Sequence, residues 1–337
     1  MTAQACEQGG LDRTRDLVTV AIPVLNEERA IDECLQRLRS QTYANIEILV
    51  ADGGSDDRTR VIVSAHAAMD DRITLVDNVG RIQGAGLNEI LTRAHGAIVV
   101  RLDARSFVDA TYVERVLDVL ARTDAAVVGG KMVPRPRPGV VAAGIALANR
   151  SAWGAGPARF HTGGGEGPAE TVYLGSFVRV WLDRVGGWAT DVGVNEDYEL
   201  NHRIRSAGGV VWFDPSLEVG YEPRADYVAL ARQYFRYGRS KAAVLRRHPG
   251  SARARQVLPS TLGPIGLTAL VGRGRLRQAT RTLVIGHLGL VALAAYLEDE
   301  DPAVRATGAV AAAVMHWSWA VGLGIGFVRP FPAAGAT

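Results

Sequence analysis

The chain has 337 residues, of which 47% are hydrophobic and 22% are charged. This length accommodates one large domain with an appended segment, and this composition excludes an intrinsically disordered chain. The formal net charge is only +3, and no DNA- or RNA-reading motif accompanies the basic segments, so we expect lipid headgroups and no nucleic acid as their partner.

The N-terminal residues carry no sign of export. Residues 1–16 are polar and lack the apolar stretch of a secretion signal, so we expect a flexible N-terminus followed by a domain that stays in the cytoplasm. The two cysteines, Cys6 and Cys34, argue against a disulfide framework, and no Cys/His spacing indicates zinc.

Residues 17–129 alternate between apolar, β-rich runs and helical patterns. Strands are predicted at 17–24, 46–51, 73–76, 97–102 and 125–129, with helices after Asn26 and at 58–69, 86–95 and 111–121. Such alternation implies right-handed crossovers and a mainly parallel sheet. Loops at the carboxyl ends of parallel strands converge on one crevice, so the acidic groups that follow three of these strands are expected to meet there. Asn26 is predicted to cap the first helix, and Asp56 or Asp57 the second.

The middle of the chain is less regular. Residues 134–168 contain several prolines and a run of three glycines, a pattern typical of loops that move over a ligand. A helix is predicted at 196–207. Residues 227–245 form an amphipathic helical pattern in which four basic residues stand among apolar and aromatic ones.

Three apolar runs follow, at 257–271, 283–297 and 306–328. Only the last, with 23 residues, reaches the ~20 residues that cross a bilayer. If 283–297 runs outward and 306–328 returns, the acidic loop 298–301 lies outside and the arginines of 273–281 lie inside, in agreement with the positive-inside rule. Residues 257–271 then re-enter the membrane or lie on its surface. The alternative is a pair of buried helices in a soluble C-terminal lobe.

Four motifs occur in order along the chain: PVLNEE at 23–28, ADGGSDD at 51–57, RLDAR at 101–105 and GVNEDYELNHRIRSAGG at 193–209. In this order they resemble the family 2 glycosyltransferases, which have the GT-A fold. RQYFRYG at 232–238 and the apolar tail further resemble the membrane-associated glucosyltransferases of the succinoglycan-biosynthesis type. The resemblance implies an α/β, Rossmann-like GT-A catalytic domain at 17–226, with a mainly parallel mixed sheet flanked by helices. It also implies an amphipathic interfacial region at 227–255 and a hydrophobic, helical, membrane-associated region at 256–330.

The resemblance implies a donor site at the ends of the first strands. Pro23, Asn26 and Glu27 would hold the nucleotide base. Asp52 would hold the uridine portion, since a carboxylate can accept from a ring N–H or from ribose hydroxyls. Gly84 would let the backbone approach the diphosphate and the sugar. Asn26 and Glu27 also suit the start of a helix, and Gly84 is equally compatible with a plain helix start.

Asp103 corresponds to the first aspartate of the family's DxD motif, which usually holds a divalent metal between the donor's two phosphates. By resemblance Asp103 would bind Mg²⁺ or Mn²⁺, which would neutralise charge on the leaving diphosphate. The third position of the motif is Arg105, which cannot ligate a metal but can pair with phosphate oxygens directly. If Arg105 points outward instead, it is a surface residue.

Asp197 matches the family's ED motif, which implies a general base that takes a proton from the acceptor hydroxyl as it attacks the anomeric carbon. One displacement opposite the leaving diphosphate inverts the configuration. By resemblance the acceptor side comprises Gly175, Ser176, Glu196, Gln233, Arg236 and Tyr237. The alternative for Glu196 and Asp197 is a pair of acids favoured by the helix dipole, and the alternative for 233–237 is an interfacial helix.

These features predict an inverting glycosyltransferase that takes a sugar from a nucleotide-diphosphate donor, expected to be UDP-linked. The expected acceptor is a lipid-linked or other glycan at the cytoplasmic face of the cell membrane, in cell-surface or exopolysaccharide synthesis. The alternative is a membrane-anchored nucleotide-sugar-binding scaffold without catalysis, which Arg105 motivates. A nucleotidyltransferase is less compatible, because the first strand is not followed by a glycine- and arginine-rich phosphate loop.

Overall fold

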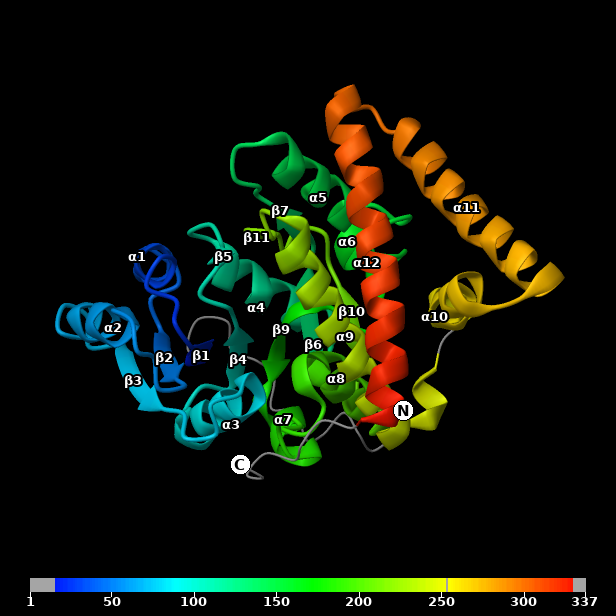
Figure 1. The fold of residues 1–337 in the computed structure, drawn as a ribbon. Coiled ribbons are helices and arrows are strands. Elements are labelled where there is room, and N and C mark those ends of the chain that lie inside the picture. Colours follow the sequence, from blue (N-terminus) through cyan, green and yellow to red (C-terminus); the bar gives the residue numbers. More distant parts are fainter. Residues whose placement is uncertain (1–15, 253, 330–337) are drawn as a thin grey trace. The chain divides into compact units, whose positions relative to one another are not determined.

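The computed structural model describes residues 16–252 and 254–329, so the expectations for Cys6 and residues 1–15 lie outside the described residues. The chain forms two compact units. The first contains the residues up to Lys131 together with Gly164–Thr190 and Glu196–Val219, and the second contains Met132–Gly163, Asp191–Asn195 and the residues from Gly220 onward. The elements of both are labelled in Figure 1.

The first unit is built on an eight-stranded mixed sheet with the strand order β3-β2-β1-β4-β9-β6-β10-β8. In chain order its strands are β1 (Val18–Val24), β2 (Ile46–Asp52), β3 (Ile73–Asp77), β4 (Ile98–Arg101), β6 (Val127–Gly130), β8 (Gly167–Pro168), β9 (Tyr173–Val178) and β10 (Val211–Phe213). β1 is parallel to β2 and β4, β2 to β3, and β6 to β10. β9 is antiparallel to β4 and β6, which gives the mixed sheet expected for a GT-A fold.

Helices flank this sheet because each has one apolar side. They are α1 (Ile31–Arg39), α2 (Thr59–Ala67), α3 (Gln83–Arg93), α4 (Tyr112–Thr123), α7 (Arg179–Val185) and α8 (Glu196–Ser206), and a short strand β5 (Ser106–Phe107) precedes α4. In α1 the predicted stripe of Ile31, Leu35 and Leu38 is buried. β1 and β2 are buried along nearly their whole length, as a strand covered on both faces should be.

The strand register gathers polar residues at one edge of the sheet. Val24 lies beside Asp52 and Asp52 beside Asp77, at the carboxyl ends of three adjacent parallel strands. On the other side of β1, Arg101 pairs with Ala21 and ends β4. The predicted convergence of strand ends is therefore present, and it places the loops that carry the acidic motifs on a common edge.

The predicted cap at Asn26 is wrong. α1 begins only at Ile31, and no side chain caps it. Asn26 has a φ of 56°, and its Oδ1 accepts a hydrogen bond from the Asp56 backbone N–H at 3.0 Å. Asparagine tolerates this left-handed conformation, so its side chain ties the loop after β1 to the loop after β2 instead of starting a helix. Asp57 does accept from the Thr59 N–H at 2.9 Å, at the start of α2.

The second unit is mainly helical. It contains β7 (Met132–Pro134), α5 (Val140–Arg150), α6 (Arg159–Thr162), η1 (Gly193–Asn195), α9 (Tyr227–Arg247), η2 (Pro249–Ser251), α10 (Ala254–Val271), α11 (Gly274–Tyr296) and α12 (Pro302–Val328), and β11 (Val219–Tyr221) leads into it. A hydrophobic core joins α5, α9, α11 and α12 through Ile145, Leu230, Val291 and Met315. Figure 1 shows α12 beside α9, and α11 diverging from α12.

Two helices in the second unit are long and apolar enough to cross a membrane. They are α11, with 23 residues, and α12, with 27. The apolar run predicted at 283–297 belongs to a longer helix, α11, which begins nine residues earlier, at Gly274, and includes the arginine cluster in its first turns.

Candidate active site

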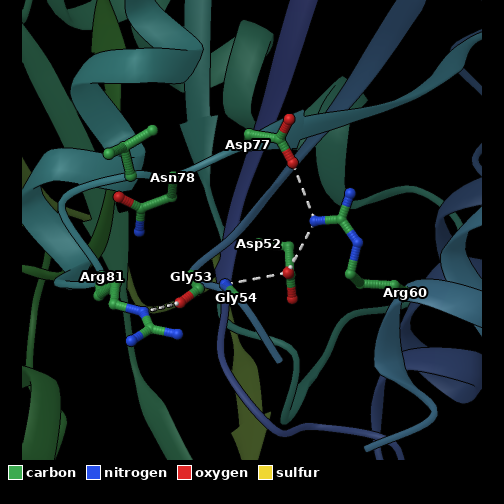
Figure 2. A pocket seen from close by; sticks show the side chains of 8 residues that line it. Asp52, Gly53, Gly54, Arg60, Asp77, Asn78 and Arg81 are labelled. Carbon is green, nitrogen blue, oxygen red and sulfur yellow. Dashed lines mark hydrogen bonds and ion pairs between the residues drawn. The ribbon is translucent and has the colours of Figure 1, made fainter. Parts of the chain in front are cut away.

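A cavity of about 250 Å³ lies at the ends of β2 and β3 in the first unit. It is lined by Asp52, Gly53, Gly54, Arg60, Asp77, Asn78, Val79 and Arg81, seven of which are labelled in Figure 2. The combination of two carboxylates with two guanidinium groups suits a ligand that carries both hydrogen-bonding groups and negative charge.

Asp52 is held tightly by its own loop. Its Oδ2 accepts from the backbone N–H groups of Gly54 and Ser55, at 3.0 and 3.1 Å, and its Oδ1 accepts from the Ser55 hydroxyl. Arg60 Nη1 lies 2.9 Å from Asp52 Oδ2 and 2.9 Å from Asp77 Oδ1, so it bridges the two acids (Figure 2). Burial alone would raise the pKa of Asp52, but the hydrogen bonds from Ser55 and Arg60 outweigh it and lower the pKa. Asp52 is therefore ionised and preorganised.

Arg81 forms the other wall of the cavity. Its Nε donates to the Gly53 carbonyl at 3.2 Å, and its backbone has a φ of 55°, which is uncommon for a residue other than glycine. Sequence reasoning missed Arg60, Asp77 and Arg81. Asp77 had a usable signal, because it ends a predicted strand in the same way as Asp52 does.

A second cluster lies at the end of β4, around a buried arginine. Arg101 is only 4% exposed and forms ion pairs with Asp103, with Glu196 and with Asp197. Its Nη2 lies 3.5 Å from Asp103 Oδ1 and 3.1 Å from Glu196 Oε1. The structure thus brings three acids from two distant motifs around one guanidinium. Arg101 was quoted within its motif, but no role was predicted for it.

Neighbouring side chains complete this cluster. Trp188 Nε1 donates to Asp197 Oδ1 at 3.2 Å, and Gln83 Nε2 donates to Asp103 Oδ1 at 2.9 Å. Asp103 keeps 37% of its side chain exposed, whereas Glu196 is only 2% exposed. A ligand can therefore reach Asp103 directly, while Glu196 is enclosed.

The electrostatics of the cluster follow from burial and mutual repulsion. Burial raises the pKa of Glu196 to about 7, because the attraction of Arg101 only partly offsets it and the charge of Asp197 adds to it. Burial raises the pKa of Asp103 as well, against the attraction of Arg101. For Arg101 itself burial works to lower the pKa, but the surrounding carboxylates outweigh it and raise the pKa. Near neutral pH this acid-rich site therefore holds a guanidinium cation together with a partly protonated Glu196.

The Asp52 cavity and the Arg101 cluster lie on neighbouring parts of the same edge of the sheet. Asp52 ends β2 and Arg101 ends β4, and β1 runs between them. Two steps of ~4.8 Å separate these strand ends across the sheet, and the three-residue stagger between Val24, beside Asp52, and Ala21, beside Arg101, adds ~10 Å along the strands. The ends therefore lie roughly 14 Å apart, a distance that one extended ligand can bridge.

Other predicted donor residues are accounted for by contacts within the fold. Arg105 Nε lies 2.8 Å from Glu27 Oε2, so these two side chains pair with each other. Pro23 lies within β1, opposite Ala51. A Cβ at Gly84 would lie 2.8 Å from the Ala189 carbonyl oxygen, so glycine there is required by packing against the segment that carries Trp188.

The predicted acceptor residues fall in different places. Gly175 and Ser176 lie within β9, where Ser176 is fully buried inside the sheet. Their role on the acceptor side stays a prediction. Gln233, Arg236 and Tyr237 all lie on α9 in the second unit, where Gln233 Nε2 donates to the Tyr237 hydroxyl at 2.9 Å.

The side chains around Asp103 fit a metal site only in part. Among the described residues no group of three or more His, Cys, Asp or Glu side chains is arranged to hold an ion. Mg²⁺, however, is often held by one or two carboxylates together with substrate phosphates, which supply the remaining ligands. The partly exposed carboxylate of Asp103 fits that limited role, and Arg105 cannot contribute a second ligand.

Comparison with known proteins identifies the family. Residues 19–145 match the model of the family described as glycosyl transferase family 2. The chain is 32% identical over 315 residues to the succinoglycan biosynthesis protein ExoA of Rhizobium meliloti. The aligned region covers 90% of this chain and 92% of that protein. It is also 33% identical over 122 residues to the glycosyltransferase AglE of Haloferax volcanii, and this aligned region covers 35% of this chain and 40% of that protein.

A solved structure has the same fold. The mannosyltransferase PcManGT from Pyrobaculum calidifontis, in complex with GDP-Man and Mn²⁺, superposes with a TM-score of 0.60 at 22% identity, covering 94% of this chain and 88% of that one. This likeness concerns the fold, and the near full-length match to ExoA settles the family. The chain belongs to glycosyltransferase family 2 and is a homologue of a protein of succinoglycan biosynthesis.

Proposed function

We propose that the protein is an inverting glycosyltransferase that moves a sugar from a nucleotide-diphosphate donor to a lipid-linked or other glycan acceptor in exopolysaccharide synthesis. The observation that carries this proposal is the cluster in which Arg101 joins Asp103, Glu196 and Asp197. A single displacement requires a base that takes the proton of the acceptor hydroxyl and a group that helps to stabilise the leaving diphosphate. Asp197 is suited to the first role and Asp103 to the second.

The donor would occupy the edge from the Asp52 cavity to Asp103. Arg60 and Arg81 supply positive charge for phosphates, and the buried carboxylate of Asp52 holds Arg60 and the loop at Gly54 in place at the proposed nucleoside site. The GDP-Man of PcManGT supports a sugar nucleotide as ligand. We propose a UDP-sugar as the donor, because Asp52 occupies the position that resembles the family's uridine-binding aspartate.

The acceptor would be activated by Asp197. Its carboxylate takes the proton of the acceptor hydroxyl while that oxygen forms a bond to the anomeric carbon, and the electron pair of the breaking C–O bond leaves with the diphosphate. Attack opposite the leaving group inverts the anomeric configuration. Arg101 forms an ion pair with Asp197, and Trp188 fixes the orientation of its carboxylate by donating a hydrogen bond to Oδ1.

Asp103 would hold a Mg²⁺ or Mn²⁺ ion that the donor phosphates share. When bound, such an ion neutralises charge on the leaving diphosphate. The Mn²⁺ bound by PcManGT supports this assignment. The work would take place at the cytoplasmic face of the membrane, an assignment that the two long apolar helices support.

Mass spectrometry of products tests the proposal. Membranes containing the protein are incubated with a panel of nucleotide sugars and lipid extract, and the glycolipid products are compared with those of membranes without it. We expect one donor to yield a product lengthened by one sugar, and the anomeric coupling constant in its proton NMR spectrum should show the inverted configuration. Binding of a donor with neither transfer nor hydrolysis in Mn²⁺, Mg²⁺ or EDTA would favour the scaffold that lacks catalysis.

A further inference from the structure

The loop between α11 and α12 is bonded to the end of α5. Trp153 Nε1 donates to Glu298 Oε1 at 2.6 Å, and the Ser151 hydroxyl donates to the same oxygen at 3.4 Å. Arg150 forms an ion pair with Glu300. These contacts fix the acidic loop to residues 150–153, within the second unit.

Residues 150–153 must lie on the same side of a membrane as the sheet. α5 has 11 residues and is roughly 16 Å long, about half the ~30 Å of a bilayer core. The segments that join it to strands β7 and β8 have mostly irregular backbone, which cannot cross hydrocarbon without leaving polar groups unsatisfied. The acidic loop is therefore expected on the side of the membrane where the strands next to α5 lie, whereas the positive-inside rule predicts 298–301 on the outside.

α12 has the contacts of a core helix. A Cβ at Gly238 of α9 would lie 2.1 Å from the Trp319 carbonyl oxygen, and a Cβ at Gly322 would lie 2.1 Å from the Phe235 carbonyl oxygen. Further along, Arg246 Nη1 donates to the Gly326 carbonyl at 2.8 Å. α9 carries exposed arginines beside this interface, and each would cost roughly 3 kcal/mol at the centre of a bilayer. α12 cannot enter hydrocarbon without taking α9 with it.

α11 and the end of α10 present a different surface. Most of α11 is exposed, including Leu283, Ile285, Leu288, Leu290, Leu293 and Tyr296. The exposed Arg273, Arg275 and Arg281 lie at one end of this apolar surface, and Arg281 Nε donates to the Ala269 carbonyl of α10 at 3.1 Å. Apolar side chains flanked by arginines complement the interface of an anionic bilayer, with the hydrocarbon receiving the leucines and the phosphates pairing with the guanidinium groups.

We propose that the protein binds an anionic membrane surface from one side only, with α10 and α11 lying in the lipid interface and with neither α11 nor α12 crossing the bilayer. Arg281, two turns into α11, bonds to α10, and Glu298, just after α11, bonds to Trp153, which favours a helix lying along the surface. The inference concerns topology and does not depend on the transfer reaction.

Cysteine labelling tests the topology. Asp299 and Glu114 are exposed, and Cys34 is buried, so D299C and E114C can be made in full-length protein that carries C6S. Intact spheroplasts and inverted vesicles are treated with a membrane-impermeant maleimide. We expect both cysteines to react only in inverted vesicles, with E114C as the cytoplasmic control. Labelling of D299C in intact spheroplasts overturns the proposal.

Vesicle flotation tests the surface itself. Purified full-length protein is mixed with vesicles of phosphatidylcholine alone or with phosphatidylglycerol added, and L288D/L293D is compared with V61D, which places a charge on an equally exposed site of α2. We expect L288D/L293D to lose at least tenfold in binding to the anionic vesicles with an unchanged melting temperature, and V61D to bind normally. Unchanged binding by L288D/L293D, or a stable dimer that covers α11 and ignores vesicles, overturns the proposal.

Discussion

Arg101, the buried last residue of β4, forms an ion pair with Asp197 in the first turn of α8. The same guanidinium contacts Asp103 and Glu196, so one cation holds together the acid assigned to the donor and the acid assigned to the acceptor. Without it, three acids would stand close together in a poorly solvated site, and their mutual repulsion would favour protonation.

Replacing Arg101 should damage both stability and transfer. Breaking a buried ion pair while leaving its partners in place costs about 3–5 kcal/mol, so R101Q should melt well below the wild type. R101K keeps the charge but loses the second donor, and it should fold, transfer at least tenfold more slowly and show an acidic limb of the pH–rate profile at higher pH. R37Q, which removes a surface pair, is the control. A wild-type rate and pH profile in R101K would remove the positioning role of Arg101.

The stability of the protein should depend on pH through Glu196. Its folded-state pKa of about 7 lies above the ordinary value of 4.5. Between pH 4.5 and 7 the unfolded chain therefore loses this proton while the folded chain keeps it, so stability falls as pH rises and levels off above pH 7. E196Q has no ionisable group at this position, so its stability does not fall in this way as pH rises. Its stability relative to the wild type should increase from pH 5 to pH 7 by at most about 3 kcal/mol, measured by urea unfolding at each pH. A constant difference between the two proteins would show that Glu196 ionises normally.

A substitution at Arg81 can separate the effect of its side chain on ligand binding from the effect of its left-handed backbone on stability. Its φ of 55° is unstrained for glycine, so R81G should keep or raise the melting temperature. Loss of the guanidinium should weaken binding of a nucleoside diphosphate about tenfold, with a smaller effect on the nucleoside. Titration calorimetry with UDP and uridine measures both, and R93Q, on the exposed end of α3, is the control. Equal losses for UDP and uridine would place Arg81 away from the phosphates.

Metal binding should require the nucleotide. Because Asp103 is the one carboxylate assigned to the ion, Mn²⁺ should bind weakly to the protein alone and clearly in the presence of UDP, as measured by electron paramagnetic resonance. D103N should abolish the signal of the ternary complex, and E114Q, at an exposed site, should leave it unchanged. Tight Mn²⁺ binding without nucleotide, or normal ternary binding by D103N, contradicts the assignment.

Much of the fold was predictable because strand ends and acidic motifs coincide in the sequence. Asp52 ends β2, Asp103 follows β4 and Asp197 begins α8, and the parallel register then places the first two on one edge. Arg101 was not predictable in its role, because a strand residue can point to either face and only the folded sheet shows which acids it meets.

Other features depended on three-dimensional context. The left-handed backbone of Asn26 turned an expected helix cap into a link between two loops. Hydropathy identified the apolar tail, but it could not show that Glu298 bonds to Trp153, the contact on which the proposed one-sided membrane binding rests.

Asp197 is proposed as the general base of an inverting transfer, whereas donor binding is assigned to the edge from the Asp52 cavity to Asp103. The most direct measurement is the transfer rate and the donor dissociation constant of D197N, determined side by side with the wild type. We expect the rate to fall at least a thousandfold while the donor dissociation constant changes less than threefold. Transfer by D197N at the wild-type rate would contradict this mechanism.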